Sequence, residues 1–255
     1  MNVDMFSLTG KTALVTGSSR GLGLIFAEGL ASGGATVVLN GRNETTLEHA
    51  LESLRRNGHR VTSKAFDITD QAAVQTAISE LESSGYSIDI LVNNAGVQQR
   101  APLHEFPEED WRRILEINLT GAFIVSKYVA QGMIRRGGGK IINICSMQSD
   151  LGRSTIAPYA ASKGGLKMLT KGMAVDWARY NIQVNGLGPG YFITEMTKPL
   201  ADDPAFDSWL TRRTPSGRWG DPEEMIGALL LLASQASTYI NGQILYVDGG
   251  LSAAI

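Results

Sequence analysis

Short apolar runs alternate with longer segments of helical periodicity along almost the whole chain. The runs are rich in β-branched residues and have the length of strands. The predicted strands are Thr12–Thr16, Thr36–Asn40, Val61–Phe66, Ile88–Val92, Lys140–Cys145, Ile182–Asn185 and Ile244–Val247. The first, fourth and fifth are nearly continuous apolar runs, as in strands that helices cover on both faces. The pattern therefore predicts an α/β fold, a Rossmann-type doubly wound parallel sheet of seven strands with helices on both faces.

One stretch interrupts this rhythm. The segment from Pro189 to Pro222 lies between the sixth and seventh predicted strands and contains five of the eight prolines. Long insertions in compact domains are usually lids or binding loops, so we expect about 190–218 to form a substrate loop. No repeat, low-complexity tract or Pro/Ser-rich linker divides the 255 residues. We therefore expect a single domain over 1–255.

Composition and charge narrow the classes of function. A net charge of -2 provides no field that would collect the phosphates of a nucleic acid. The first residues lack the pattern of a signal peptide, and the apolar run Ala228–Ala233 is far shorter than the roughly 20 residues that span a bilayer. We expect a cytoplasmic protein that acts on a small polar molecule and binds neither nucleic acid nor membrane. One cysteine and three histidines without metal-ligand spacing predict no metal site.

A glycine-rich segment follows the first predicted strand. It reads Thr16-Gly17-Ser18-Ser19-Arg20-Gly21-Leu22-Gly23 and opens a helical segment, so its amides and the helix N-terminus can face a pyrophosphate. A purely structural turn remains an alternative. The position at the carboxyl end of the first strand favours a bound dinucleotide. The predicted cofactor-binding residues of this loop are Gly17, Ser19, Arg20, Gly21, Leu22 and Gly23.

The same segment satisfies the G-x-S-x-G pattern of a serine-hydrolase nucleophile elbow, through Gly17, Ser19 and Gly21. That chemistry needs a general-base histidine late in the chain. The last histidine is His104. The hydrolase alternative is therefore disfavoured.

The end of the second predicted strand bears on the choice between NAD and NADP. NAD sites usually place an acid there to bind the ribose 2′-hydroxyl, whereas a 2′-phosphate calls for arginine. This strand ends Asn40-Gly41-Arg42, and Arg42 and Arg20 together offer two cations to a phosphate. We predict that Asn40 and Arg42 contact NADP(H), with NAD(H) left open. A solvated loop arginine is the alternative for Arg42.

A tyrosine and a lysine form the centre of the predicted catalytic set. Tyr159 and Lys163 are four residues apart in a segment with helical apolar spacing, so they share one helix face. A free tyrosine titrates near about pH 10, and a neighbouring ammonium stabilises its phenolate. Ser146, at the end of the fifth predicted strand, could hold a substrate oxygen against the tyrosine. The set predicts hydride transfer between a nicotinamide and a carbon that carries an alcohol or ketone.

In combination, these motifs resemble those of the classical short-chain dehydrogenase/reductase family. The resemblance runs from about Leu8 to Gly250. The matching pieces are Thr16-Gly17-x-x-x-Gly21-x-Gly23, Asp67, Asn93-Asn94-Ala95-Gly96, Asn118, Ser146, Tyr159-x-x-x-Lys163, Pro189-Gly190 and Thr194.

The resemblance implies a role for each motif. Tyr159 would be the general acid–base, and Ser146 would orient the substrate carbonyl or hydroxyl. Lys163 would bind the nicotinamide ribose and tune Tyr159, and Asn118 would support a water relay to Lys163. A buried, hydrogen-bonded amide is the alternative for Asn118. The further cofactor contacts that the resemblance implies are Asp67, Ile68, Asn94, Ala95, Gly96, Tyr159, Lys163, Pro189, Gly190, Ile193 and Thr194.

Three loops narrow the expected substrate. The segments 146–153, 190–197 and 217–222 resemble those of family members that interconvert D-gluconate and 5-keto-D-gluconate. This resemblance implies a sugar acid, and Arg100 and Arg153 could pair with its carboxylate. Ketodeoxygluconate, 3-oxoacyl compounds and other ketones are alternative substrates.

An alternative of another class is a redox sensor that binds the dinucleotide without turnover. A sensor has no need of Ser146, Tyr159 and Lys163 together, so their joint presence favours an enzyme.

Family resemblance also implies that helices at 107–136 and 157–180 pack against their copies in a homotetramer. A homodimer is the alternative.

Overall fold

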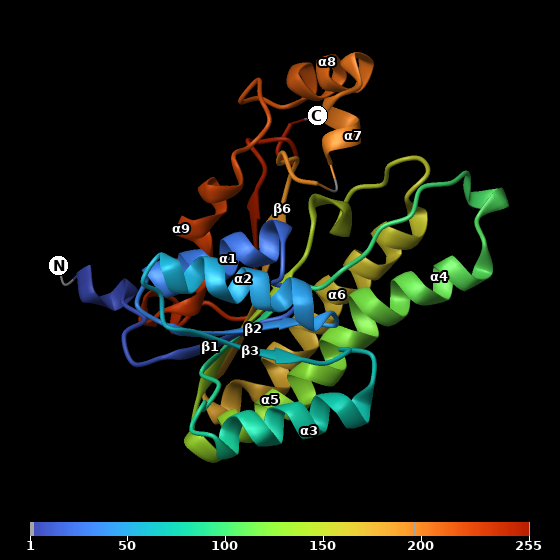
Figure 1. The fold of residues 1–255 in the computed structure, drawn as a ribbon. Coiled ribbons are helices and arrows are strands. Elements are labelled where there is room, and N and C mark those ends of the chain that lie inside the picture. The colour runs from blue at the N-terminus through green and yellow to red at the C-terminus, as the bar shows by residue number, and fades with distance from the viewer. Residues whose placement is uncertain (1–2, 196, 255) are drawn as a thin grey trace.

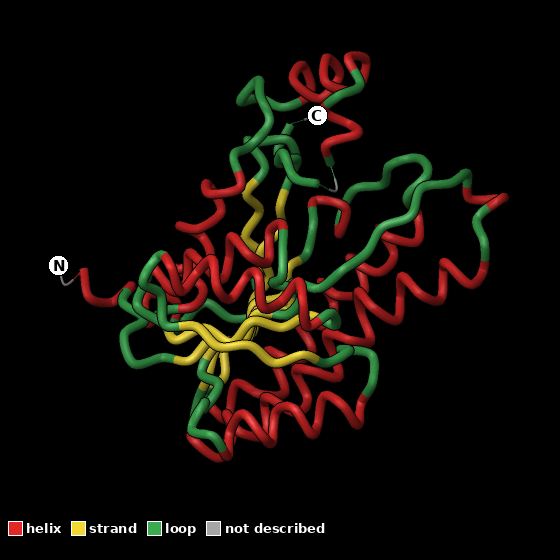
Figure 2. Tube along the Cα trace, viewed as in Figure 1, coloured by secondary structure: helices red, strands yellow, loops and turns green. Residues whose placement is uncertain are grey.

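Seven parallel strands form one sheet at the centre of the molecule, in the order β3-β2-β1-β4-β5-β6-β7. The structure is a computed structural model that describes residues 3–195 and 197–254. Helices cover both faces of the sheet (Figures 1 and 2), which confirms the predicted fold class. The strands are β1 (Thr12–Val15), β2 (Thr36–Gly41), β3 (Val61–Ala65), β4 (Ile90–Asn93), β5 (Gly139–Ile144), β6 (Ile182–Pro189) and β7 (Ile244–Val247). The helices are α1 (Gly21–Ser32), α2 (Glu44–Arg56), α3 (Gln71–Ser83), α4 (Glu108–Leu115), α5 (Gly121–Arg136), α6 (Ala157–Trp177), α7 (Lys198–Ala201), α8 (Pro204–Arg213) and α9 (Ile226–Ala233).

The alternation of side chains along the strands builds two apolar cores. Ala13 and Val15 of β1 pack with α1, α2 and α9 on one face of the sheet. Leu14 points to the other face, where it packs with α3, α5 and α6. Strands β2 and β4 divide their residues in the same way. A fully buried aliphatic side chain such as Leu14 stabilises the fold by about 1.5–3 kcal/mol.

Strand β6 is longer than its apolar pattern indicates. The pattern ends at Asn185, but the strand pairs with β5 as far as Leu187 and with β7 as far as Pro189. Its second half contains Gly186 and Gly188, and a Cβ on either would lie within 2.4–2.5 Å of a β7 side chain. Glycine is therefore needed for close packing here, although a glycine pair in a sequence is typical of a turn.

The order of the strands places a crevice at one edge of the sheet. β1 lies between β2 and β4, so the connections that leave β1 and β4 run to opposite sides. Ligands of doubly wound sheets bind at this point, outside the carboxyl ends of the strands. The stretch after β6, predicted as an irregular loop, contains the helices α7 and α8, which rise beyond this end of the sheet at the top of Figure 1.

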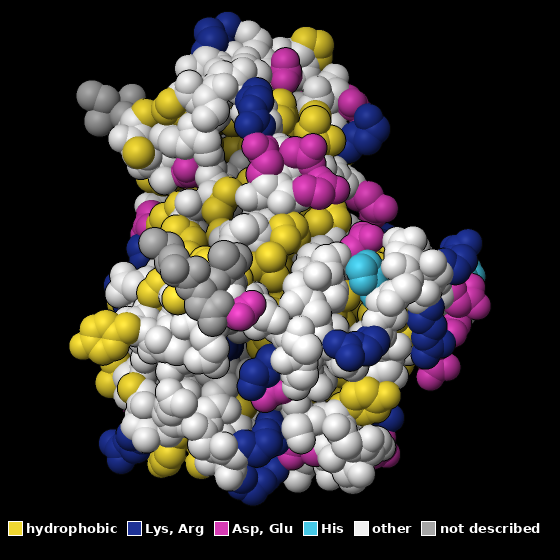
Figure 3. Space-filling view, turned by 90° about the vertical axis from the view of Figure 1, so that its left-hand side faces the viewer, with side chains coloured by type: hydrophobic (Ala, Val, Ile, Leu, Met, Phe, Trp, Pro, Cys, Tyr) yellow, Lys and Arg dark blue, Asp and Glu magenta, His cyan; other side chains and the backbone are white. Residues whose placement is uncertain are grey.

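The surface has no single large basic region on the face drawn in Figure 3, where Lys and Arg side chains are spread among other residues. Within 3–195 and 197–254, no helix has both the length and the apolar character that crossing a bilayer requires.

Candidate active site

A cavity of about 620 Å³ opens at the carboxyl ends of the central strands. Residues from the glycine loop, from the ends of β2 and β3, and from the loops after β4, β5 and β6 line it. The predicted site residues among them are Gly17, Ser19, Arg20, Gly21, Leu22, Gly23, Asn40, Arg42, Asp67, Ile68, Asn94, Ala95, Gly96, Arg100, Ser146, Arg153, Tyr159, Lys163, Pro189, Gly190 and Thr194. Two predicted residues, Asn118 and Ile193, do not line it, and Ile193 is 54% exposed.

The loop after β1 has the shape of a cradle. Gly17 adopts a φ of 63°, which favours glycine. A Cβ on Gly23 would lie 2.3 Å from the carbonyl oxygen of Gly17 and 2.5 Å from Nδ2 of Asn94, so no other residue fits there. Helix α1 begins at Gly21, and the first amides of a helix have no helical acceptor. The loop can therefore bind a diphosphate through main-chain N–H groups.

The side chain of Asn40 joins the glycine loop to β3 and to the residue that follows it. Its Nδ2 donates to the carbonyl oxygens of Lys64 and Phe66, at 3.2 and 3.1 Å. Its Oδ1 accepts from the amide of Gly17 at 3.4 Å, and the residue is buried. These bonds occupy the side chain of Asn40, so its role is to hold the glycine loop against the end of β3.

Two arginines, Arg20 and Arg42, line the cavity, and each forms an exposed ion pair. Nη1 of Arg42 lies 3.7 Å from Asp67, and Nη1 of Arg20 lies 3.7 Å from Glu195. Both arginine side chains are more than two-thirds exposed, and exposed ion pairs contribute only about 0–1 kcal/mol. Either arginine can therefore turn to a phosphate at little cost.

Burial raises the pKa of Asp67, but hydrogen bonds from Thr69 and the charge of Arg42 together hold it below its usual range. Asp67 is thus an anion at the end of β3. Its Oδ1 accepts from both the amide and the hydroxyl of Thr69, at 2.9 and 2.8 Å. The remaining oxygen of the carboxylate faces Arg42.

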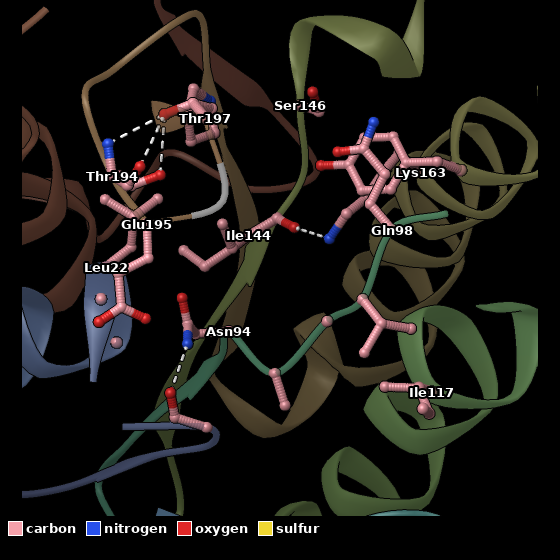
Figure 4. Close-up of a pocket in the computed structure, with 18 of the residues that line it drawn as sticks. Leu22, Asn94, Gln98, Ile117, Ile144, Ser146, Lys163, Thr194, Glu195 and Thr197 are labelled. Atoms are coloured by element: carbon pink, nitrogen blue, oxygen red, sulfur yellow. Dashed lines mark hydrogen bonds between the residues drawn. The ribbon is translucent and has the colours of Figure 1, made fainter. Parts of the chain in front are cut away.

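Ser146, Tyr159 and Lys163 meet where β5 ends against α6. Ser146 begins the short 3-10 helix Met147–Ser149, and its Oγ accepts from the amide of Gln148 at 3.1 Å. Nζ of Lys163 donates to the carbonyl oxygen of Ile144 at 2.7 Å (Figure 4) and lies 5.7 Å from the centre of the Tyr159 ring. The three predicted catalytic side chains are therefore brought together.

The electrostatics of this group differ from the prediction. Burial raises the pKa of the Tyr159 phenol to about 12, and a hydrogen bond with Ser146 opposes this rise. Burial also lowers the pKa of Lys163 to about 8. The shift of the Tyr159 pKa comes from its burial, from Ser146, and from the charges of Cys145 and Tyr191, while the Lys163 ammonium donates to the Ile144 carbonyl. Tyr159 is therefore a proton donor at neutral pH.

Asn118 does not line the cavity and lies in a π-helical turn (Glu116–Thr120) between α4 and α5. Its Oδ1 accepts from the amide of Val97 at 2.8 Å, and its Nδ2 donates to the Val97 carbonyl and to Ser162 Oγ, both at 3.0 Å. The side chain is thus a buried, hydrogen-bonded amide that joins the loop after β4 to α6. π-helical turns occur frequently at functional sites. The water relay through Asn118 stays a prediction.

Arg100 and Arg153 reach the cavity beside the insertion. Nη1 of Arg153 donates to the Tyr191 hydroxyl at 3.3 Å, and its guanidinium lies 4.5 Å from the centre of the Phe206 ring. Burial, and then the charge of Arg153, lower the pKa of Arg100. Among the described residues neither arginine forms an ion pair with a carboxylate. The two cations can therefore bind an anion.

Sequence reasoning missed part of the cavity wall. Tyr191, Phe206 and Trp219 pack with ring centres 5.5–6.2 Å apart, and the first of them lines the cavity. The available signal was that the proline-rich stretch 189–222 contains five aromatic residues, these three among them. Gln98 and Gln148 also line the cavity, and nothing in their spacing distinguished them from surface amides.

Comparisons with known proteins agree with this geometry. The family model described as short chain dehydrogenase matches residues 11–205. Gluconate 5-dehydrogenase of Gluconobacter oxydans (strain 621H) is 53% identical over 252 residues, which are 99% of this chain and 98% of that protein. 5-keto-D-gluconate 5-reductase of Escherichia coli (strain K12) is 50% identical and covers 99% of both chains. A solved gluconate 5-dehydrogenase from Burkholderia cenocepacia J2315, in complex with NADP and tartrate, is 54% identical with a TM-score of 0.97 over 99% of both chains.

Proposed function

The chain belongs to the short-chain dehydrogenase family, and we propose that it is an NADP(H)-dependent oxidoreductase that interconverts D-gluconate and 5-keto-D-gluconate. The pair Arg100 and Arg153 carries the substrate part of this proposal. Both line the same cavity as Ser146 and Tyr159, and neither has a carboxylate partner among the described residues. A sugar-acid anion would provide that partner. The reactions named for the two relatives at 53% and 50% identity support the same substrate.

The cavity is lined by residues suited to the separate parts of NADP(H). The glycine cradle would hold the diphosphate, and Arg20 and Arg42 would hold the 2′-phosphate. Lys163, at the other end, would bind the nicotinamide ribose. Bound NADPH supplies the hydride, and the cationic ring of NADP would lower the pKa of Tyr159 when the reaction runs toward the ketone.

For reduction, the side chains act on one oxygen atom. The Ser146 hydroxyl donates a hydrogen bond to the ketone oxygen and orients it. As the ketone carbon accepts the hydride, the electron pair of the C=O bond moves to the oxygen, which takes the proton of the Tyr159 hydroxyl. Lys163, with a pKa near 8, is suited to return a proton toward Tyr159 near neutral pH. Oxidation of the alcohol is the reverse of these steps.

A substrate panel tests this function. Purified protein is mixed with NADPH or NADH and with 5-keto-D-gluconate, ketodeoxygluconate, a 3-oxoacyl thioester or an aliphatic ketone, and cofactor absorbance is followed. We expect the highest kcat/KM for NADPH with 5-keto-D-gluconate. A higher value for another ketone would assign that substrate instead.

The Tyr159→Phe variant separates an enzyme from a sensor. Removal of the general acid should lower kcat about 100- to 10,000-fold, while NADPH binding stays unchanged. Turnover retained in this variant would contradict the assignment of Tyr159. If the protein were a sensor, the wild type and Tyr159→Phe would both bind NADPH, and neither would reduce any ketone in the panel.

We further propose a cytoplasmic homotetramer, or a homodimer as the alternative. Large apolar side chains are exposed on α5 and α6, namely Phe123 (46%), Met168 (66%) and Val175 (77%). Large apolar side chains exposed on these two helices favour an interface between chains. Light scattering should give the mass of four chains, and the mass of one chain would contradict the assembly.

A further inference from the structure

One buried amide in the cavity wall has no partner. Gln148 is 8% exposed and lines the cavity, and its Oε1 forms no hydrogen bond. The other such atom among the described residues is Oδ1 of Asn93. That amide lies outside the cavity, and its Nδ2 is already bonded to Ser126 and Asn143. Gln148 is therefore the unpartnered buried amide that a ligand in the cavity can reach.

A polar atom that is buried without a hydrogen bond costs free energy, so in a native structure it calls for a specific explanation, and a ligand that supplies the missing hydrogen bond is one. Rotation of the terminal amide by half a turn exchanges its oxygen and nitrogen, so Gln148 can offer either an acceptor or a donor. The group is neutral. Its natural partner is a neutral group that both donates and accepts, such as a hydroxyl.

The turn that carries Gln148 also carries the residue that holds the reacting oxygen. The amide of Gln148 donates to Ser146 Oγ at 3.1 Å, and the amide of Ser146 donates to Ser149 Oγ at 3.3 Å. These two bonds fix Gln148 relative to Ser146. A group bound by Gln148 must therefore lie close to the carbon whose oxygen Ser146 binds.

The proposed function leaves the substrate hydroxyls without partners, since Arg100 and Arg153 bind the carboxylate and Ser146 and Tyr159 bind the reacting oxygen. We propose that Gln148 binds a hydroxyl group on a carbon next to the reacting carbonyl and so makes the enzyme selective for α-hydroxy ketones. This inference rests on the proposed function. It goes beyond it by naming the residue that distinguishes a polyhydroxy ketoacid from a plain one.

The test compares two ketoacids of equal length and charge. 5-Keto-D-gluconate and 5-oxohexanoate both have the carboxylate at one end and the ketone at the fifth carbon, but the second has no hydroxyls. The quantity measured is the ratio of their kcat/KM values with NADPH. In the wild type we expect a strong preference for 5-keto-D-gluconate. In Gln148→Met, which keeps the length of the side chain and removes its polar atoms, we expect that ratio to fall about 10- to 100-fold.

The control variant is Gln75→Met, the same change at an exposed position of α3, which should keep the wild-type ratio. Thermal melting and the KM for NADPH report whether the fold and the cofactor groove are intact. If Gln148→Met does not fold, the shorter Gln148→Leu gives the same comparison.

Two outcomes overturn the inference alone. They are an unchanged ratio in a folded Gln148 variant, and a wild type that reduces both ketoacids equally well. A wild type that reduces neither ketoacid would overturn the proposed function as well, so the two failures are distinct.

Discussion

The side-chain amide of Asn94 donates a hydrogen bond to the carbonyl oxygen of Gly17, 3.1 Å away. The same nitrogen donates to the carbonyl of Thr16 at 3.0 Å. Asn94 follows β4 and Gly17 follows β1, so these bonds fasten the two loops that bound the crevice. Asn94 therefore joins the glycine loop to the loop after β4, and the shape of the glycine loop depends on the absence of a side chain at Gly23.

The substitution Gly23→Ala tests this dependence. The added Cβ would meet Gly17 O and Asn94 Nδ2, so the loops must separate. We expect the free energy of unfolding to fall by about 1–3 kcal/mol and the KM for NADPH to rise about tenfold or more. Urea unfolding and steady-state kinetics measure the two effects.

Gly227→Ala is the matched control. Gly227 lies in α9, and a Cβ there would meet nothing within 4 Å. Since alanine is the better helix former, we expect a gain of up to about 1 kcal/mol and an unchanged KM. The same response from both variants would mean that the glycine loop is not crowded.

Arg42 should determine which dinucleotide is preferred. Among residues 3–195 and 197–254, its one ion pair is the exposed contact with Asp67. In Arg42→Gln we expect the KM for NADPH to rise about tenfold through loss of the phosphate contact, while the KM for NADH changes little. Arg56→Gln, on the exposed end of α2, is the control. An equal rise for both dinucleotides would contradict a role in binding the 2′-phosphate.

Local pattern and chain order made most of the fold and site predictable. The predicted ranges overlap all seven strands. The first, fourth and fifth were the clearest, because strands buried on both faces need continuous apolar sequence. Ser146 and the glycine loop follow parallel strands, so they had to meet at the same edge of the sheet. The proximity of Tyr159 and Lys163 could be predicted from the helical period alone, because residues four apart lie on the same face of a helix.

Contacts between distant segments could not be predicted in this way. The stacking of Arg153 on Phe206 joins the loop after β5 to helix α8, and no local spacing encodes it. Ile193 follows the family motif but lies outside the cavity. The direction of the pKa shift of Tyr159 depends on how deeply α6 is buried and on where Lys163 points. Both are properties of the packed structure.

Arg153 should bind the substrate and leave the cofactor unaffected. In Arg153→Gln we expect the KM for 5-keto-D-gluconate to rise about tenfold, since a charge-assisted contact is lost, and the KM for NADPH to stay unchanged. Arg100→Gln should act in the same direction. Arg56→Gln again serves as the control. If the KM for 5-keto-D-gluconate is unchanged in both variants, the two arginines have no carboxylate role.

Burial of Lys163 should appear in the pH dependence of stability. Its pKa falls from 10.5 to about 8 on folding, so between these values the unfolded chain binds a proton that the folded chain has lost. The free energy of unfolding therefore rises with pH in this window, and the cost of burying the ammonium is fully present below it. Relative to Lys163→Met, the wild type should gain about 2 kcal/mol between about pH 8 and 10. Urea unfolding of both proteins across this range measures the gain, and Lys171→Met, an exposed position on the same helix, is the control.

Because Tyr159 is present in every variant, its own titration cancels in the comparison. Parallel curves for the wild type and Lys163→Met would mean that Lys163 keeps its proton in the folded protein, and the proton return assigned to it near neutral pH would then be wrong.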